Sequence, residues 1–324
     1  MRKRIIPFLM LLASAFSAFA QSGEGSGVAL GNIGFTRDPV SLSMGAVSAA
    51  VPSFAMSALT NPAWAPFGDG IFDFALSGGM WQPGKPSGTT GINFGTAGNL
   101  DDRFGYSFGA GSDLGSPYTL MDEDGYLGES TTPGQMFIAA GLAYRFLDLF
   151  SIGIGGRYYN QSLSPVAAYS AFAGNAYAMF VLEGLRVTAG VSDLGGRLAG
   201  TYSLPAQAVA GAAYSHTFGE DHGVEVAAEA GWYLHGALRA GAGASYTWKK
   251  MISARAGYIY GGDSPLPDAI TAGLGFSFKG IHLDAAYIVS KGPAGNSFTV
   301  GIGFKLHNKQ HERIRTESDE LAGR

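Results

Sequence analysis

The chain has 324 residues and a formal net charge of -4, and 14% of its residues are charged, against roughly 25% in soluble domains. It contains 50 glycines and no cysteine. The lack of cysteine excludes disulfides and cysteine-ligated metals, and the small net charge without a basic stripe speaks against nucleic acid as a partner. The length suits two soluble domains or one large all-β unit.

Residues 1–20 have the features of a signal peptide. A basic start at residues 1–4 precedes an apolar run at 5–19, and Ala18-Phe19-Ala20 forms a small-x-small cleavage site. A single anchor helix is the alternative, but the run is short for a membrane span. We therefore predict export. No later stretch reaches 18 uninterrupted apolar residues, so any later span has to be part of a closed β-barrel.

Residues 21–67 precede the regular part of the chain. Residues 21–43 are rich in Gly and Ser and show no strong pattern, whereas residues 44–67 are mostly small and apolar. Pro52 and Ser53 predict a short helix that runs to Leu59, with Ser53 as its N-cap.

From residue 71 onward, apolar and polar residues alternate with a period of two. Phe298, Val300 and Ile302 share one face of such a segment, and Thr299 lies on the other. About ten residues of alternation is the length of a tilted membrane strand. The pattern predicts an all-β fold, a transmembrane antiparallel β-barrel of about fourteen strands within residues 68–307. The predicted strands are 71–82, 90–98, 104–113, 135–146, 150–162, 171–182, 185–195, 205–218, 222–234, 238–248, 252–262, 268–279, 281–290 and 297–307.

The connections alternate in length. Links after even-numbered strands are short, as at 147–149, and links after odd-numbered strands are mostly longer, as at 114–134 and 196–204. The short link near His235 is the exception. Outer-membrane barrels have short periplasmic turns and longer external loops. The alternation therefore predicts a cell outer-membrane barrel with both termini in the periplasm.

The two faces of the strands distinguish a barrel from a soluble β-sandwich, which also alternates. In a sandwich the polar face is rich in Lys, Glu and Thr, but here it is mainly Gly, Ser, Thr and Ala with isolated charges. A charge on the lipid face would cost about 2–4 kcal/mol at mid-bilayer, so these charges are predicted to face a polar lumen. They are Asp73, Arg157, Glu225, Glu229, Arg239, Arg255 and Asp284. Aromatic residues lie near strand ends on the other face, as expected for interfacial girdles.

Gly-x-Gly pairs recur on the predicted lumen face, as at Gly153/Gly155, Gly241/Gly243, Gly273/Gly275 and Gly301/Gly303. Such glycines would let a neighbouring strand or an inserted plug approach closely. The alternative is low-bulk filling of the lumen, which we favour over a specific role in ligand binding.

Candidate catalytic and metal-binding motifs lack the context they need. Ser107 lies in a G-x-S-x-G match, but inside a predicted strand instead of the strand-turn-helix that a nucleophile requires. His307 and His311 lie in or beside a charged tail without further ligands, and the acidic loop at 122–125 lacks the rest of a calcium-binding loop. We predict no catalytic residue, no metal and no cofactor. The tail at 308–324 is predicted to be periplasmic and poorly ordered, or a docking peptide.

The motifs Met44-Gly45 and Asn61-Pro62-Ala63, at their observed separation, resemble the N-terminus of the PorV/PorQ family. Those outer-membrane proteins are related to the FadL fatty-acid channels. The usual acidic pair is replaced by Ser53-Phe54. The resemblance implies a fourteen-stranded barrel whose lumen holds an N-terminal plug, here residues 21–67.

Two functions follow from this resemblance. In the PorV/PorQ type, the barrel is not an enzyme and serves type IX secretion, with secreted cargo proteins and other secretion components as its partners. The alternative is a FadL-like channel for hydrophobic small molecules, in which a plug gates passage. A barrel-bound enzyme such as a lipase is a third and weaker hypothesis, since no Ser, His and acidic residue converge.

Overall fold

The computed structural model describes residues 38–51, 54–68, 70–83, 88–101, 103–121, 124–164, 167–198, 202–234, 236–262, 267–290 and 295–307. The predicted signal peptide at 1–20, the first part of the predicted plug at 21–37, and the tail at 308–324 lie outside these residues. No helix within the described ranges is long and apolar enough to cross a membrane.

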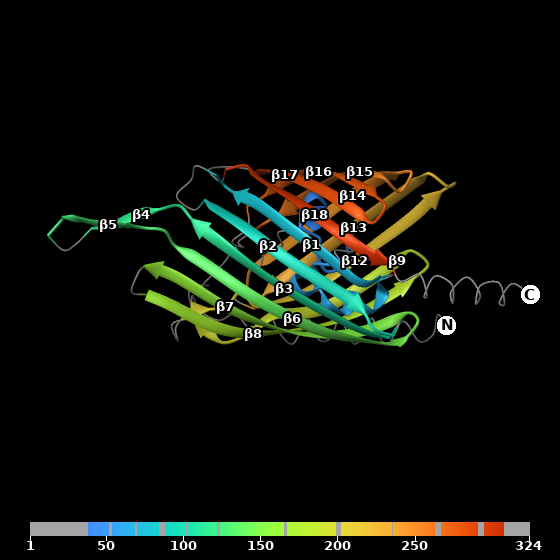
Figure 1. Cartoon of the computed structure of the whole chain (residues 1–324), viewed down its shortest axis with the longest axis horizontal. Helices are drawn as coiled ribbons and strands as arrows, with labels where there is room; N and C mark the ends of the chain where they lie inside the picture. Colours follow the sequence, from blue (N-terminus) through green and yellow to red (C-terminus); the bar gives the residue numbers. More distant parts are fainter. Residues whose placement is uncertain are drawn as a thin grey trace, which may run out of the picture.

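Fourteen antiparallel strands form one closed barrel, which confirms the predicted fold class (Figure 1). All fourteen predicted segments are strands, and β1 pairs with β18 to close the sheet. The barrel strands are β1 (Gly70–Trp81), β2 (Thr89–Asn99), β3 (Phe104–Gly115), β6 (Gly134–Leu147), β7 (Phe150–Ser164), β8 (Ala167–Leu182), β9 (Leu185–Gly195), β12 (Gln207–Phe218), β13 (His222–Tyr233), β14 (Leu238–Trp248), β15 (Ile252–Tyr260), β16 (Ala269–Phe278), β17 (Ile281–Ser290) and β18 (Ser297–His307).

The alternation of the sequence becomes the two faces of the wall. On β18, Phe298, Val300 and Phe304 are exposed on the outside, while Thr299 is buried on the inside. Closure removes the free edges that an open sheet would present, which is what a membrane-spanning sheet requires. The outside of the wall is therefore a belt of large apolar side chains.

The two ends of the barrel differ. Gly70 pairs with His307, so β1 begins and β18 ends at the same end, which we call the terminal end. Its turns are tight, as at Glu183 and Gly184, which both have positive φ angles. The opposite end, the loop end, carries two small hairpins inside segments predicted only as loops. These are β4 (Tyr118–Met121) with β5 (Leu127–Thr131), which projects from the barrel in Figure 1, and β10 (Arg197–Leu198) with β11 (Tyr202–Ser203).

The N-terminal segment lies inside the barrel as α2 (Pro39–Ser43), η1 (Ser57–Leu59) and η2 (Pro62–Phe67). The prediction of a helix from Pro52 to Leu59 was wrong in extent, because the described helix there is a single 3-10 turn with Met56 at its N-cap and no side-chain cap. The predicted cap, Ser53, lies outside the described residues.

The short helix α2 was missed by the sequence analysis. Asp38 caps it by accepting hydrogen bonds from the backbone N–H groups of Val40 and Ser41, and Pro39 occupies its first turn. The Asp-Pro start signal was present in the sequence, but the helix has only five residues, too short for its periodicity to be recognised.

Candidate functional site: the plugged lumen

A ring of wall glycines lies against the plug. A Cβ atom built on most of these glycines would overlap plug atoms, often atoms of the plug main chain. The plug therefore occupies the space that a side chain at these wall positions would need. These positions therefore show close approach of an inserted plug, one of the two uses of such glycines that the sequence suggested. The contacts are Gly301 with Pro39, Gly273 with Ser43, Gly243 and Gly257 with Met44, Gly241 with Gly45, Gly211 with Ala50, Gly95 with Ala55, Gly109 with Leu59, Gly141 with Pro62, Gly153 with Ala63 and Gly105 with Ala65.

The first predicted plug motif, Met44-Gly45, sits at the end of α2. Met44 is fully buried against the wall. Gly45 has a φ of 75°, and a Cβ there would meet the backbone oxygen atoms of Ala242 and Tyr258. Its N–H donates to Thr271 Oγ1 at 3.1 Å. Glycine is needed here both for the positive φ angle and for the close approach to the wall.

The second motif, Asn61-Pro62-Ala63, joins the two halves of the plug. The Asn61 side chain donates to the carbonyl oxygen of Ala49 at 2.9 Å and to Thr188 Oγ1 at 3.0 Å. Its Oδ1 accepts from the N–H of Ala63 at 2.9 Å, which caps η2 with Pro62 in the first turn. Asn61 therefore supplies partners for buried backbone groups, and Trp64 Nε1 also donates to the carbonyl oxygen of Ala49 at 3.1 Å.

Glu229 holds the first half of the plug, residues 38–51. One carboxylate oxygen accepts from the backbone N–H groups of Ser48 at 2.8 Å and Ala49 at 2.7 Å. The other accepts from Arg239 Nη2 at 2.7 Å, and Arg239 Nε donates to Gln207 Oε1 at 2.9 Å. The carboxylate is buried with its charge paired and its oxygens hydrogen-bonded, the arrangement in which a buried ion pair is tolerated. We call this group the Glu229 contact.

Arg157 holds the second half of the plug, residues 54–68. Its Nη2 donates to the carbonyl oxygen of Leu59 at 2.7 Å, and its Nη1 pairs with Asp193 at 3.0 Å. Tyr159 donates to the same Asp193 at 2.5 Å. We call this group the Arg157 contact. Ser151 adds a hydrogen bond to the carbonyl oxygen of Ala63 at 2.7 Å.

The remaining predicted lumen charges lie on the inner face of the wall. Arg255 pairs with Asp284 at 2.7 Å, and Arg186 pairs with Glu225. Asp73 is buried on β1. Arg255, Asp284 and Asp73 all line one cavity of about 320 Å³ between the plug and the wall.

Two charged partners, Arg186 and Asp193, were missed by the sequence analysis. Arg186 lies two residues from the inward-facing Thr188 on β9, so the alternation was sufficient to place it in the lumen. Asp193 does not follow this alternation, because the pairing of β8 with β9 shifts register there and Asp193 has a φ of 56°. This irregularity turns the carboxylate into the lumen, and no signal in the sequence indicated it.

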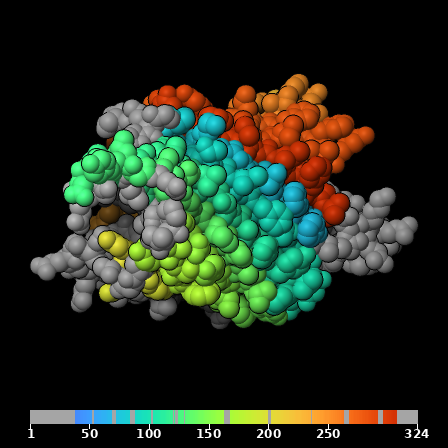
Figure 2. Space-filling model, turned by 60° about the vertical axis from the view of Figure 1, so that its left-hand side comes forward, coloured from blue at the N-terminus to red at the C-terminus, as the bar shows by residue number. Residues whose placement is uncertain are grey.

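Toward the loop end, the lumen is more apolar than predicted. The Tyr159 cluster packs aromatic and aliphatic side chains from β6, β7, β8 and the β10–β11 hairpin. The Ile259 cluster packs β15–β17 and Trp81 against Leu42 of the plug. Figure 2 turns this end forward and shows the surface hollowed beside the β4–β5 segment. The residues of the Tyr159 cluster are Phe137, Tyr159, Tyr169, Ala171, Ala173, Leu198 and Leu204.

The rejected chemical motifs find no catalytic setting in the described part of the chain. Ser107 lies within β3, and its Oγ is 3.5 Å from the carbonyl oxygen of Gly141 in the neighbouring strand. Among the described residues no group of three His or acidic side chains is placed to hold a metal ion. His311 and Glu123 lie outside those residues.

Comparison with known proteins places this fold among outer-membrane transporters. No family model and no curated protein matches the sequence. The toluene transporter TodX of P. putida matches with a TM-score of 0.62 at 14% identity, over 85% of this chain and 99% of that one. The Ralstonia pickettii toluene transporter TbuX matches at 0.60 and 15% identity, over 84% and 100%. A Pseudomonas aeruginosa FadL homologue matches at 0.55 and 13% identity, over 84% and 99%. The chain therefore has the barrel fold of FadL-type outer-membrane proteins.

Proposed function

We propose that this chain is a gated outer-membrane channel for small hydrophobic molecules, with its terminal end in the periplasm. The observation that carries the proposal is the apolar lumen above a docked plug. A water-filled porin has a polar interior, whereas here the Tyr159 and Ile259 clusters cover two parts of the inner face toward the loop end. The fold shared with toluene transporters supports the same substrate class.

The described arrangement is the closed state in this proposal. The wall glycines bring the plug into direct contact with most of the barrel strands, and two polar contacts hold its two halves. A hydrophobic molecule is collected in the apolar lumen, and it passes after one half of the plug leaves the wall. Glu229 and Arg157 are the positioning residues of this gate, and no covalent step is involved.

A plug-locking disulfide tests the proposal. A Cβ on Gly211 would lie 3.3 Å from the Cβ of Ala50, close to the 3.5–4.5 Å of disulfides, and the chain has no cysteine of its own. In a deletion strain, the wild-type chain should restore initial uptake of radiolabelled toluene. A50C/G211C should restore it only after addition of a reductant. A50S/G211S, which adds the same bulk without a crosslink, is the control.

Two results would contradict the channel. One is unchanged toluene uptake in the deletion strain, and the other is full uptake by the oxidised, crosslinked variant. The first result would show that the hydrocarbon is not a substrate, and the second would show that transport does not require movement of the plug.

A second candidate is the non-enzymatic PorV/PorQ role in type IX secretion. The observation that favours it is the N-terminal motif of Met44-Gly45 and Asn61-Pro62-Ala63. In this role the projecting β4–β5 hairpin is a surface for cargo or partner proteins. Comparing the secreted proteins of the deletion strain with the wild type separates the two candidates, because a channel for small molecules leaves that set unchanged.

A further inference from the structure

The outside of strands β12, β13 and β14 carries two adjacent rows of alanine. Strand pairing places three alanines side by side in the first row and three in the second, one from each strand. The next residues on β9, Ala189 and Val187, continue the rows. The alanine rows are Ala210, Ala230 and Ala240, then Ala212, Ala228 and Ala242.

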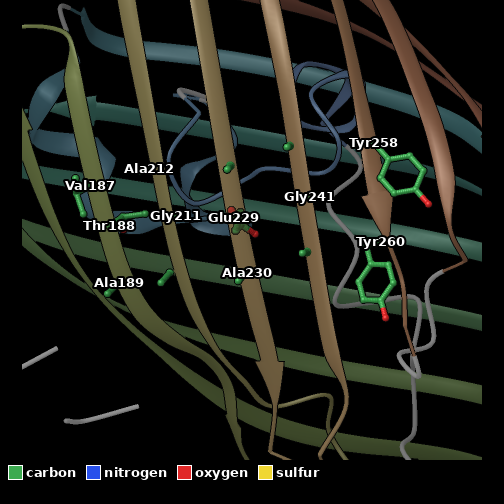
Figure 3. A pocket seen from close by; sticks show the side chains of 14 residues that line it. Val187, Thr188, Ala189, Gly211, Ala212, Glu229, Ala230, Gly241, Tyr258 and Tyr260 are labelled. Carbon is green, nitrogen blue, oxygen red and sulfur yellow. The ribbon is translucent and has the colours of Figure 1, made fainter. Parts of the chain in front are cut away.

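Large side chains border these alanines on β13 and β14 toward the loop end, on β12 and β13 toward the terminal end, and on the β15 side. Trp232 and Leu238 stand toward the loop end, and Tyr214 and Val226 stand toward the terminal end. On β15, Tyr260 pairs with Ala240 and Tyr258 pairs with Ala242. The result is a groove of about 690 Å³ in the outer surface, with the two tyrosine rings at one side (Figure 3).

The groove is closed toward the lumen. The pairing of β12 with β13 and of β13 with β14 is regular throughout, so no gap opens between these strands. On the inner side, Gly211 and Gly241 contact the plug, and Glu229 stands between them in register and binds Ser48 and Ala49. Figure 3 shows the plug segment behind these strands. An occupant of the groove therefore reaches it from outside the barrel.

The lining determines the chemistry of the occupant. It consists mainly of alanine methyl groups and tyrosine rings, and the Glu229 carboxylate is turned inward. A water molecule needs two to four polar partners, which this surface does not supply. An empty groove would lose the dispersion contacts of its walls. No Lys or Arg lines it, so nothing there would bind the phosphates of a charged headgroup. The occupant is recognised through its hydrocarbon.

The bordering side chains favour a flexible chain over a helix. On the central strand β13 only two alanines lie between Trp232 and Val226, and they are about 7 Å apart because alternate residues lie roughly 6.8 Å apart. A helix from another protein is about 10–12 Å wide, so Trp232 and Val226 would keep it off these alanines. The groove is continuous with the apolar belt that a membrane barrel presents to lipid. We infer that it binds one acyl chain of a membrane phospholipid, independently of any transport function.

Native mass spectrometry of the mature full-length protein in mild detergent tests this inference. The delipidated protein is titrated with palmitoyl-oleoyl phosphatidylethanolamine, and the fraction carrying one lipid is measured. A228L/A242L fills the groove, and A254L/A285L adds the same leucines at exposed alanines on β15 and β17. We expect the wild type and the A254L/A285L control to retain one lipid, and the groove variant to bind it at least tenfold more weakly.

Heat-modifiable gel mobility verifies that each variant is a folded barrel, and the single substitution A242L replaces A228L/A242L if the latter does not assemble. Equal binding by all three proteins would overturn the inference, as would equal loss in both double variants. If the protein retains lipopolysaccharide and no phospholipid, the bound acyl chain does not belong to a phospholipid, and the inference is wrong. A wild-type dimer that A228L/A242L dissociates would show that a second copy occupies the groove.

Discussion

The charged wall contacts of the two plug halves are of opposite kinds, whereas Thr271 both accepts from Gly45 and donates to Ser43 in the first half. In the first half, residues 38–51, the Glu229 contact offers a carboxylate that accepts two backbone N–H groups. In the second half, residues 54–68, Arg157 and Ser151 donate to the backbone carbonyl oxygens of Leu59 and Ala63. Each half thus brings its own unsatisfied backbone groups to the wall, and the wall supplies complementary partners.

This difference indicates that one half of the plug can leave the wall while the other stays bound. Asn61 and Trp64 link the two halves directly through the carbonyl oxygen of Ala49, but each half has its own ion pair on a different part of the wall. Single cysteines report on each half, because the chain has none of its own: V47C for the first and A58C for the second, both buried. Their labelling rates with a water-soluble maleimide measure how often each half leaves the wall.

The largest effect is expected from filling the space of a wall glycine. In G243L the new side chain occupies the position of the Met44 main chain, which has no rotamer with which to avoid it. We expect V47C labelling to approach the rate of the unfolded protein. G156L is the matched control, because a Cβ there meets nothing within 4 Å. Equal labelling in G243L and G156L would show that the plug is not docked against β14.

Removal of the Glu229 carboxylate should release mainly the first half. In E229A, Arg239 is left buried without its partner and the N–H groups of Ser48 and Ala49 lose their acceptor. Breaking a buried pair costs about 3–5 kcal/mol, so labelling at V47C should rise by roughly a hundredfold or more. D284A breaks the Arg255 pair, which makes no hydrogen bond to the plug backbone, and serves as control. A larger rise at A58C than at V47C would refute the separation of the halves.

Removal of the Arg157 guanidinium should have a smaller effect, directed at the second half. In R157M the carbonyl oxygen of Leu59 loses its donor, but Asp193 keeps the hydrogen bond from Tyr159. Hydrogen bonds to charged groups contribute about 1.5–3 kcal/mol, so labelling at A58C should rise by roughly ten- to a hundredfold. Labelling at V47C is the internal control, and a rise there of equal size would mean that the plug moves as one unit.

The smallest effect is expected from S151A. It removes one neutral hydrogen bond to the carbonyl oxygen of Ala63, which contributes about 1 kcal/mol, so A58C labelling should rise by about fivefold. S107A is the control, since Ser107 approaches only a wall carbonyl. If S107A alters labelling as much as S151A does, the hydrogen bond to Ala63 does not hold this half.

The fourteen strands were predictable because alternation is a local property. Phe298, Val300 and Phe304 face outward through their own positions along β18, whatever β1 and β17 contribute. The hairpins β4–β5 and β10–β11 were not predictable in the same way, because two-residue and five-residue strands carry too little alternation to be distinguished from loops.

The lumen was only partly predictable. Alternation placed Glu229, Arg239 and Arg157 on the polar face, and Glu229 pairs with Arg239. The plug groups that Glu229 and Arg157 bind lie far away in the sequence and could not be predicted. Asp193 was not predicted to face the lumen because the irregular pairing of β8 with β9 interrupts the alternation of inward and outward residues there. The plug motif around Met44 and Asn61 was found by resemblance to a known family. Only the three-dimensional structure shows that the plug main chain packs directly against glycines of the wall.

The sequence by itself determined the number of strands, the faces of the wall and the positions of the turns, because each depends on residues a few places apart. Only the tertiary structure decided how the plug contacts the wall. Ser48 meets Glu229 across 181 residues of sequence, and Arg157 meets Leu59 across 98. Such contacts depend on closure of the barrel and the register of its strands, which bring distant residues together.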